Sequence, residues 1–234
     1  MPEPDLLSSP AGYAIKHGDI DVGATPLHIR SLLDRQQYHD PLGEAERAGI
    51  SAAAWPMFGL VWPSARVLAA EMQTHPLLGL SVLEVGCGLA LASLVVQQRG
   101  GNVTASDCHP LAGDFMAHNA RLNHLPAPNY LTGNWRGLNP GLGRFDLIMG
   151  SDLLYERDLP ALLAAFIECH AKPRCEVVIV DPNRGNRVAF NRHMRDFGYV
   201  GTERMVAVLP GIDKEAYRGR VLSYKREQLA TTRQ

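Results

Sequence analysis

A short glycine turn followed by a carboxylate carries most of the chemistry that this sequence shows. The run Leu83–Leu91 reads LEVGCGLAL, with glycine at positions 86 and 88, and Asp107 follows a second apolar run. A buried strand, a glycine turn, a helix and a second strand that ends in an acid together form a site for an adenosine-containing cofactor. Gly86 and Gly88 let the backbone pass close to the ligand, and the next helix offers its N-terminal amides. Asp107 is placed to accept hydrogen bonds from both ribose hydroxyls.

The residues of the turn distinguish two classes of adenosine cofactor. A dinucleotide turn needs a small residue at its sixth position, where a helix packs closely around a pyrophosphate. Counted from Gly86, this position is Leu91, which disfavours a nicotinamide dehydrogenase. A turn for S-adenosylmethionine begins with an acid two residues before the first glycine, and Glu84 provides it. We therefore expect S-adenosylmethionine, with Glu84 near the amino group of the cofactor; an ordinary strand-to-helix turn is the alternative interpretation.

Length and composition indicate one soluble domain and disfavour several functions. The 234 residues are 46% hydrophobic and 20% charged, which is ordinary for a globular protein. The net charge of −1 gives no broad reason to bind nucleic acid or an anionic membrane. No run reaches the roughly 18 apolar residues of a membrane span, and the first residues do not resemble a signal peptide. The four cysteines and nine histidines show no metal-ligand spacing. We expect a cytoplasmic protein with reduced thiols and no metal.

Apolar runs and turn residues predict a Rossmann-like, doubly wound α/β sheet of about seven strands with helices on both faces. The expected strands lie near residues 81–86, 102–106, 128–131, 145–150, 175–181, 199–208 and 219–226. The expected helices lie near 89–99, 110–123, 158–171 and 186–197, after a first helix from Pro63 to about Thr74. Residues 51–234 would form this domain, which we expect to be an S-adenosylmethionine-dependent methyltransferase. Residues 1–50 would be an N-terminal extension, either a lid or a docking segment, in which only Pro26–Gln37 looks helical.

Ligands of open α/β sheets bind beyond the carboxyl ends of the strands, and several polar residues fall there. After the third expected strand, Asn134 and Trp135 could read and cover an adenine ring. Ser151 ends the fourth strand beside the point where the strand order reverses, so it is a further cofactor candidate. Asp152 follows it. After the fifth strand comes the run Asp181–Gly185, which also has the composition of a simple turn.

From Trp55 to Tyr224 the chain resembles the class I, seven-strand S-adenosylmethionine-dependent methyltransferases, and specifically the lysine-methyltransferase-like group called methyltransferase family 16. The glycine turn and the second-strand acid match this group, and so does a helix with spaced asparagines at 119 and 123. The most specific match is the Asp-x-x-Tyr motif after the fourth strand, which is Asp152-Leu-Leu-Tyr155 here. The resemblance also implies that Trp62, just before the first helix, lies near the methionine part of the cofactor.

Two departures from the group concern the cofactor site. The group usually has a third glycine where this chain has Ala90, which is small enough for binding to survive. Many members have an acid where this chain has Asn134, which weakens its assignment to adenine. The run Asp181–Gly185 resembles a segment in the branch similar to the electron-transfer flavoprotein β-subunit lysine methyltransferase.

The expected reaction is methyl transfer to a nitrogen, with a protein lysine favoured as the acceptor. A lysine amine has a pKa near 10.4, so its deprotonation at pH 7 costs about 4.6 kcal/mol. A carboxylate alone favours the ammonium, so Asp152 is expected to capture and orient the acceptor rather than act as a strong base. Tyr155 would line the acceptor channel with its ring. A small-molecule N-methyltransferase and a non-catalytic cofactor-binding module remain alternatives. The prolines of many nucleic-acid amino methyltransferases are absent from this loop.

Overall fold

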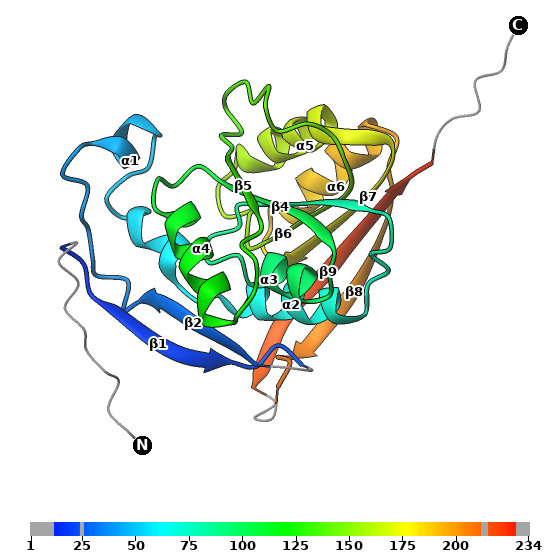
Figure 1. Ribbon diagram of the computed structural model, residues 1–234. Coiled ribbons are helices and arrows are strands. Elements are labelled where there is room, and N and C mark those ends of the chain that lie inside the picture. Colours follow the sequence, from blue (N-terminus) through cyan, green and yellow to red (C-terminus); the bar gives the residue numbers. More distant parts are fainter. Residues whose placement is uncertain (1–11, 24–25, 212–214, 228–234) are drawn as a thin grey trace, which may run out of the picture.

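The computed structural model describes residues 12–23, 26–211 and 215–227 (Figure 1). Its strands are β1 (Ile15–Ile20), β2 (Leu27–Leu32), β3 (Ser81–Val85), β4 (Asn102–Asp107), β5 (Asn129–Thr132), β6 (Phe145–Ser151), β7 (Ala171–Asp181), β8 (Val200–Val208) and β9 (Ala216–Arg226). Its helices are α1 (Glu44–Arg47), the 3-10 helix η1 (Trp55–Gly59), α2 (Pro63–Thr74), α3 (Leu91–Gln98), α4 (Ala112–Leu122), α5 (Leu159–His170) and α6 (Arg187–Asp196).

The central sheet has seven strands in the order β5-β4-β3-β6-β7-β9-β8. β3 pairs in parallel with β4 on one side and with β6 on the other, and β9 runs antiparallel to both of its neighbours. The strand order therefore reverses between β3 and β6, which is the position where doubly wound sheets bind their ligands. The predicted α/β fold is confirmed, and the elements of the sheet lie where the sequence places them. Two strands begin earlier than expected, β7 at Ala171 and β9 at Ala216.

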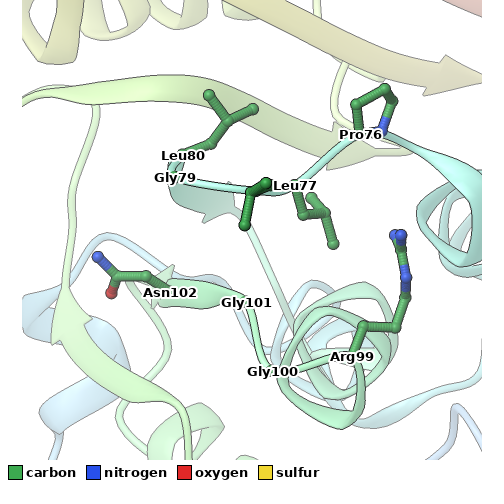
Figure 2. Close-up of a pocket in the computed structure, with 9 residues that line it drawn as sticks. Pro76, Leu77, Gly79, Leu80, Arg99, Gly100, Gly101 and Asn102 are labelled. Carbon is green, nitrogen blue, oxygen red and sulfur yellow. The ribbon is translucent and has the colours of Figure 1, made fainter.

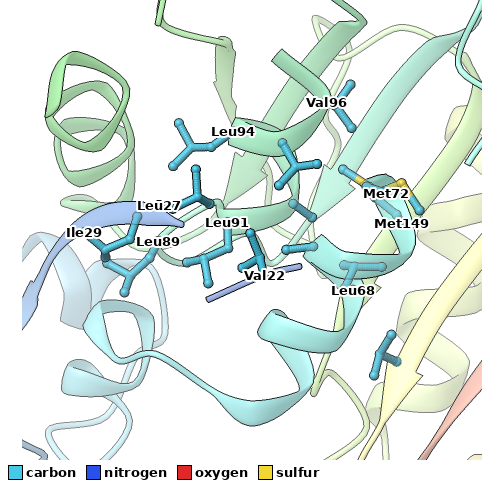
Figure 3. Close-up of a cluster of buried hydrophobic side chains, with 14 of the residues drawn as sticks. Val22, Leu27, Ile29, Leu68, Met72, Leu89, Leu91, Leu94, Val96 and Met149 are labelled. Atoms are coloured by element: carbon cyan, nitrogen blue, oxygen red, sulfur yellow. The ribbon is translucent and has the colours of Figure 1, made fainter. Parts of the chain in front are cut away.

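Helices cover both faces of this sheet because its strands alternate between two buried faces (Figure 1). Along β3, Val82 belongs to the apolar core beneath α2 and α3, whereas Leu83 and Val85 belong to the core beneath α5 and α6. Figure 3 shows the first core, in which Leu68 and Met72 of α2 and Leu91, Leu94 and Val96 of α3 gather with Met149 of β6. The candidate site residues at the strand ends thus follow a buried apolar layer.

The prediction of a helix at Pro26–Gln37 is wrong. This segment contains β2, which pairs antiparallel with β1. Leu27 and Ile29 are buried, and His28 between them is exposed, which is the two-residue period of a strand with one covered face. Leu27 and Ile29 join the core beneath α2 and α3 (Figure 3), so burial of alternate residues overrides any helical preference.

Two asparagines, Asn119 of α4 and Asn123 at the C-cap of this helix, attach the β1–β2 hairpin to the body of the protein. Asn119 accepts a hydrogen bond from the backbone N–H of Arg30 (2.8 Å) and donates one to its carbonyl (3.2 Å). Asn123 does the same with His28, at 2.9 and 2.8 Å. Four residues of helix rise about 6 Å and two residues of strand about 6.6 Å, so the two spacings match. The described part of residues 12–50 is therefore bonded to the body, and its role as a lid or docking segment stays a prediction.

A cavity of about 650 Å³ lies at the opposite edge of the sheet from the expected site. Pro76–Leu80, before β3, and Arg99–Asn102, before and at the start of β4, line it (Figure 2). These are the amino ends of the two strands, and doubly wound sheets bind ligands at the carboxyl ends. We therefore do not assign this cavity to the site. None of the helices in the described ranges has the length and apolar character that a membrane crossing needs.

Candidate cofactor and acceptor site

The glycine turn between β3 and α3 requires glycine for two separate reasons. Gly86 and Gly88 have left-handed backbone conformations, with φ of 58° and 51°. A Cβ added at Gly86 would lie 2.6 Å from Leu153 Cδ2, and one added at Gly88 would lie 2.8 Å from the Phe58 carbonyl oxygen. Neighbouring protein segments therefore approach this turn closely. Ala90 is also left-handed, with φ of 61°, and that cofactor binding survives alanine at this position stays a prediction.

Asp107 ties the end of β4 to the glycine turn. Its Oδ2 accepts a hydrogen bond from the Gly88 N–H and its Oδ1 accepts one from the His109 N–H, both at 2.9 Å. The side chain keeps some exposed surface, yet the surrounding protein is dense enough that burial raises the pKa of this carboxyl. Asp107 is thus a fixed acceptor beside the turn, as a ribose site requires.

Glu84 lies deeper than a direct cofactor contact would suggest. It is buried, and its Oε2 accepts hydrogen bonds from the backbone N–H (2.8 Å) and the hydroxyl (2.5 Å) of Ser93. Burial raises the pKa of Glu84 to about 7, although the two bonds from Ser93 oppose this shift. The carboxyl group therefore fastens the first turn of α3 to β3. Its predicted bond to the amino group of the cofactor stays a prediction.

Of the aromatic and amide candidates, Trp135 is the one in direct proximity to the turn. A Cβ added at Gly86 would be 3.5 Å from Trp135 Cζ2, so Trp135 lies beside the turn, where it also packs on the core beneath α5. Trp62 precedes α2, and its indole N–H donates to the Met57 carbonyl (2.8 Å). Asn134 is committed locally, because its Oδ1 accepts the Arg136 N–H (2.9 Å). The amide oxygen expected to read the adenine amino group therefore already has a donor, and that assignment stays a prediction.

The 3-10 helix η1 packs beside the glycine turn and against His109, which follows β4. The Phe58 ring stacks on His109 with 3.7 Å between centroids and 16° between planes, and Trp55 meets His109 edge-on at 5.5 Å. Burial lowers the pKa of His109 to about 4, so the imidazole is neutral near pH 7. No cluster of metal-ligating side chains occurs within the described ranges.

The acceptor candidates follow β6, next to the glycine turn. Ser151 pairs in register with Val180 of β7, and the Asp152 N–H donates to the Val180 carbonyl (2.9 Å). Asp152 has φ of 58°, and its side chain is only 12% exposed. Tyr155 is 56% exposed, and local desolvation raises its pKa to about 12, so it is a neutral phenol near pH 7.

Asp152 is paired with a cation that the motif does not include. Arg184 donates to Asp152 Oδ1 from both Nε (3.0 Å) and Nη2 (2.6 Å). The Arg184 N–H in turn donates to Asp181 Oδ1 (2.6 Å). Asn186 donates to the carbonyls of Leu154 and Glu156, each at 2.9 Å. The loops after β6 and β7 are therefore bonded into one unit.

Neither Arg184 nor Asn186 could be recognised from the sequence as part of the site. The sequence offered two signals near Arg184: the polar run Asp181–Gly185, whose composition also suits a simple turn, and the resemblance of this run to a segment of one branch of the family. Asn186 lies just outside this run. Asp181 is fully buried, and within the described part of the chain its Oδ2 has no hydrogen-bond partner. Asn183 has φ of 66° and accepts a bond from Arg220 Nε (3.1 Å). Both residues support the loop that carries Arg184.

The site can now be set beside known proteins. A family model described as lysine methyltransferase matches residues 46–195, which include the glycine turn, Asp107 and the Asp152–Tyr155 loop. The chain belongs to this family. The resemblance predicted from the sequence is confirmed.

Curated relatives agree with this assignment. The electron transfer flavoprotein beta subunit lysine methyltransferase of Rattus norvegicus is 32% identical over 143 residues, which are 59% of this chain and 55% of that protein. Protein N-lysine methyltransferase METTL21A of Mus musculus is 30% identical over 149 residues, 57% of this chain and 67% of that protein. The chain thus spans about half the length of the rat relative that it matches.

A solved structure agrees on the fold. The magnesium protoporphyrin IX methyltransferase of Synechocystis PCC 6803 with bound SAM superposes with a TM-score of 0.55 at 17% identity. The superposition covers 82% of this chain and 86% of that one. This likeness supports the Rossmann-like sheet and no finer property.

Proposed function

We propose that this chain is an S-adenosylmethionine-dependent methyltransferase that methylates lysine side chains of a protein substrate. One observation carries the proposal. Leu153, inside the Asp152–Tyr155 motif, lies against the glycine turn, 2.6 Å from the Cβ position of Gly86. The loop expected to hold the acceptor therefore adjoins the turn expected to hold the cofactor, at the switch point of a lysine-methyltransferase-family fold.

The residues at this site fit S-adenosylmethionine. Two left-handed glycines, a carboxylate fixed at the end of β4 and Trp135 beside the turn form the set that an adenosine group needs. Gly86, Gly88, Asp107 and Trp135 would hold it, with Trp62, Glu84, Asn134 and Ser151 as further candidates. When bound, the cofactor supplies a methyl group on a sulfonium, which is already electrophilic.

The protein therefore has to position and deprotonate the acceptor. An amine must approach the methyl carbon in line at about 3–3.5 Å. Asp152 would attract the lysine ammonium and orient it, and the exposed Tyr155 ring would flank its approach, which can contribute about 0.5–2 kcal/mol. Neither residue is a strong base at neutral pH, so solvent would take the proton.

An exposed acceptor side favours a protein substrate over a small molecule. A small-molecule enzyme would need residues 1–60 to close over the ligand, but the described hairpin is bonded to α4, and Tyr155 is 56% exposed. The name of the rat relative makes the electron transfer flavoprotein β-subunit the first acceptor to test. The net charge of −1 supports a substrate other than nucleic acid. Four unpaired cysteines support a reducing, cytoplasmic location.

The test separates cofactor binding from methyl transfer. The purified protein is incubated with S-adenosylmethionine labelled in its methyl group and with either the electron transfer flavoprotein β-subunit or total lysate protein. Asp152→Asn suits the left-handed backbone at this position and removes the charge. We expect it to reduce methyl transfer at least tenfold while calorimetric S-adenosylmethionine affinity stays within about threefold.

Asp158→Asn is the matched control, because Asp158 is an exposed carboxylate paired with Arg136 near the same edge. It should retain both binding and transfer. Label appearing only in small molecules would replace the proposal with a small-molecule methyltransferase. Binding without transfer by the wild type would indicate a non-catalytic module.

A further inference from the structure

Arg184 is hydrogen-bonded to Asp152, the carboxylate that would bind the acceptor lysine in the proposed function. Its guanidinium makes two hydrogen bonds to one oxygen, Oδ1 of Asp152, which leaves Oδ2 outside this pair. Asp152 is nearly buried, with 12% of its side chain exposed, and Arg184 is 39% exposed. A guanidinium in this position places a permanent positive charge beside the methyl-acceptor site.

We infer that Arg184 is a positioning residue of the methyl transfer: it holds Asp152 and offsets its charge, so that the bound acceptor amine loses its proton more readily. The inference rests on the proposed lysine methylation. An unpaired carboxylate beside an amine stabilises the ammonium, which is the unreactive form, whereas a nearby cation stabilises the neutral amine. Asp152 can therefore orient the acceptor through Oδ2 with less of this penalty when Arg184 is bound to Oδ1.

The other charged and titratable groups around this pair do not replace Arg184. They are Tyr155 and Glu156 on the same loop, the acid Asp107 at the end of β4 with the thiol Cys108 after it, Asp181 at the end of β7, Arg187 on α6 and Tyr217 on β9. Glu156 and Asp181 are acids, and burial raises the pKa of the two tyrosines, which stay neutral. Arg187 is bonded to both carboxylate oxygens of Glu203. Arg184 is thus the cation with direct bonds to Asp152.

The position of Arg184 is built into the fold. Asp181 is fully buried and binds the Arg184 N–H at 2.6 Å, so the backbone that carries the side chain is anchored to β7. Asn183 adopts a left-handed conformation immediately before it and is bonded to Arg220 of β9. Asn186 fastens the partner loop through Leu154 and Glu156. A surface ion pair formed by chance would not require these supports.

The test is the pH profile of kcat, which reports ionisation in the enzyme–substrate complex. The acceptor is the purified electron transfer flavoprotein β-subunit, or the lysate protein that the wild type labels if that differs, supplied with S-adenosylmethionine at saturation. For Arg184→Met we expect the acidic limb to move up by about one pH unit. At pH 7 kcat should fall about tenfold and recover toward the wild-type value as the pH rises. Arg184→Lys keeps the charge and should stay within about threefold of wild type.

Two further variants separate charge from structure. The double variant Asp152→Asn, Arg184→Met removes both charges and should return the acidic limb toward its wild-type position. Arg136→Met removes an exposed guanidinium that pairs with Asp158 and should leave the limb unchanged. Calorimetric S-adenosylmethionine affinity should be unchanged in Arg184→Met, which also shows that the variant is folded.

Each other outcome overturns the inference. A loss of kcat by the same factor at every pH would make Arg184 a structural support only. A lower KM with higher kcat at pH 7 would show that Arg184 competes with the acceptor for Asp152. An active wild type with an unshifted Arg184→Met profile would contradict the inference alone, whereas a wild type that forms no methyllysine would overturn the proposed function with it.

Discussion

The carboxylates near the switch point have similar sequence contexts but different partners, and the partners decide their roles. Asp107 is held by two backbone N–H groups beside the glycine turn. Glu84 is buried against Ser93, and Asp152 is paired with Arg184. Each acid lies at or beside the carboxyl end of a parallel strand, so the sequence could place all three at one edge of the sheet. Their partners lie on other elements and become visible only in the folded chain.

Glu84 predicts a pH dependence of stability. Its folded pKa of about 7 lies above the ordinary value of 4.5, so the folded state holds the proton more tightly than the unfolded state does. This contribution is present below pH 4.5 and is lost as the pH rises through 7, by up to ~3 kcal/mol. Glu84→Gln mimics the protonated carboxyl and therefore removes the pH dependence that Glu84 contributes. The free energy of unfolding in urea, measured at about pH 5 and pH 8, should fall with rising pH in the wild type relative to Glu84→Gln. The same difference between the two proteins at both pH values would contradict a raised pKa of Glu84 in the folded state.

At the scale of elements, η1 and the glycine turn form one packed unit. Gly88→Ala places a Cβ 2.8 Å from the Phe58 carbonyl, so η1 must shift. Gly100→Ala is the matched control, because Gly100 is also left-handed, with φ of 71°, and has open space around its Cβ position. In both variants the left-handed backbone at an alanine destabilises the folded state by about 1–2 kcal/mol. We expect Gly88→Ala, but not Gly100→Ala, also to lose S-adenosylmethionine binding measured by calorimetry. Equal affinities of the two variants would refute the idea that the contact between η1 and Gly88 shapes the cofactor site.

The hydrogen bonds of Asn119 and Asn123 to the backbone of β2 should stabilise the N-terminal β1–β2 hairpin. Asn119→Ala leaves the N–H and C=O of Arg30 without their partner and should cost about 1–3 kcal/mol in chemical denaturation. The Arg30 amide should also exchange its hydrogen faster. Arg121→Ala, at an exposed position of the same helix, should change neither quantity by a comparable amount. Unchanged exchange in Asn119→Ala would mean that the apolar contacts of Leu27 and Ile29 hold the hairpin alone.

Local pattern explains which elements could be predicted. The parallel strands are continuous apolar runs, and Pro63 marks the start of α2, so their positions follow from neighbouring residues. The segment Leu27–Leu32 is too short for its alternation to be distinguished from a helical period. Its strand conformation depends on β1 and on α4, some 90 residues away in the chain. The same limit applies to Arg184, whose partner is 32 residues earlier.

For the whole molecule, the fold brings the glycine turn and the loop proposed to hold the acceptor to adjacent strands. β3 carries the glycine turn and β6 carries the Asp152–Tyr155 loop, and the two strands pair in parallel. The β1–β2 hairpin is bonded to the helix α4 (Figure 1). Tyr155, on the loop after β6, is 56% exposed. This arrangement suits a lysine on the surface of another protein.

The identity of the methylated residue tests the central claim most directly. Protein labelled by the wild-type chain with methyl-labelled S-adenosylmethionine is hydrolysed to amino acids, and the labelled product is identified by chromatography against methyllysine standards. The account predicts that the label is recovered as methyllysine and that Asp152→Asn lowers its yield at least tenfold. Label recovered in another amino acid, or an equal yield of methyllysine from Asp152→Asn, would contradict it.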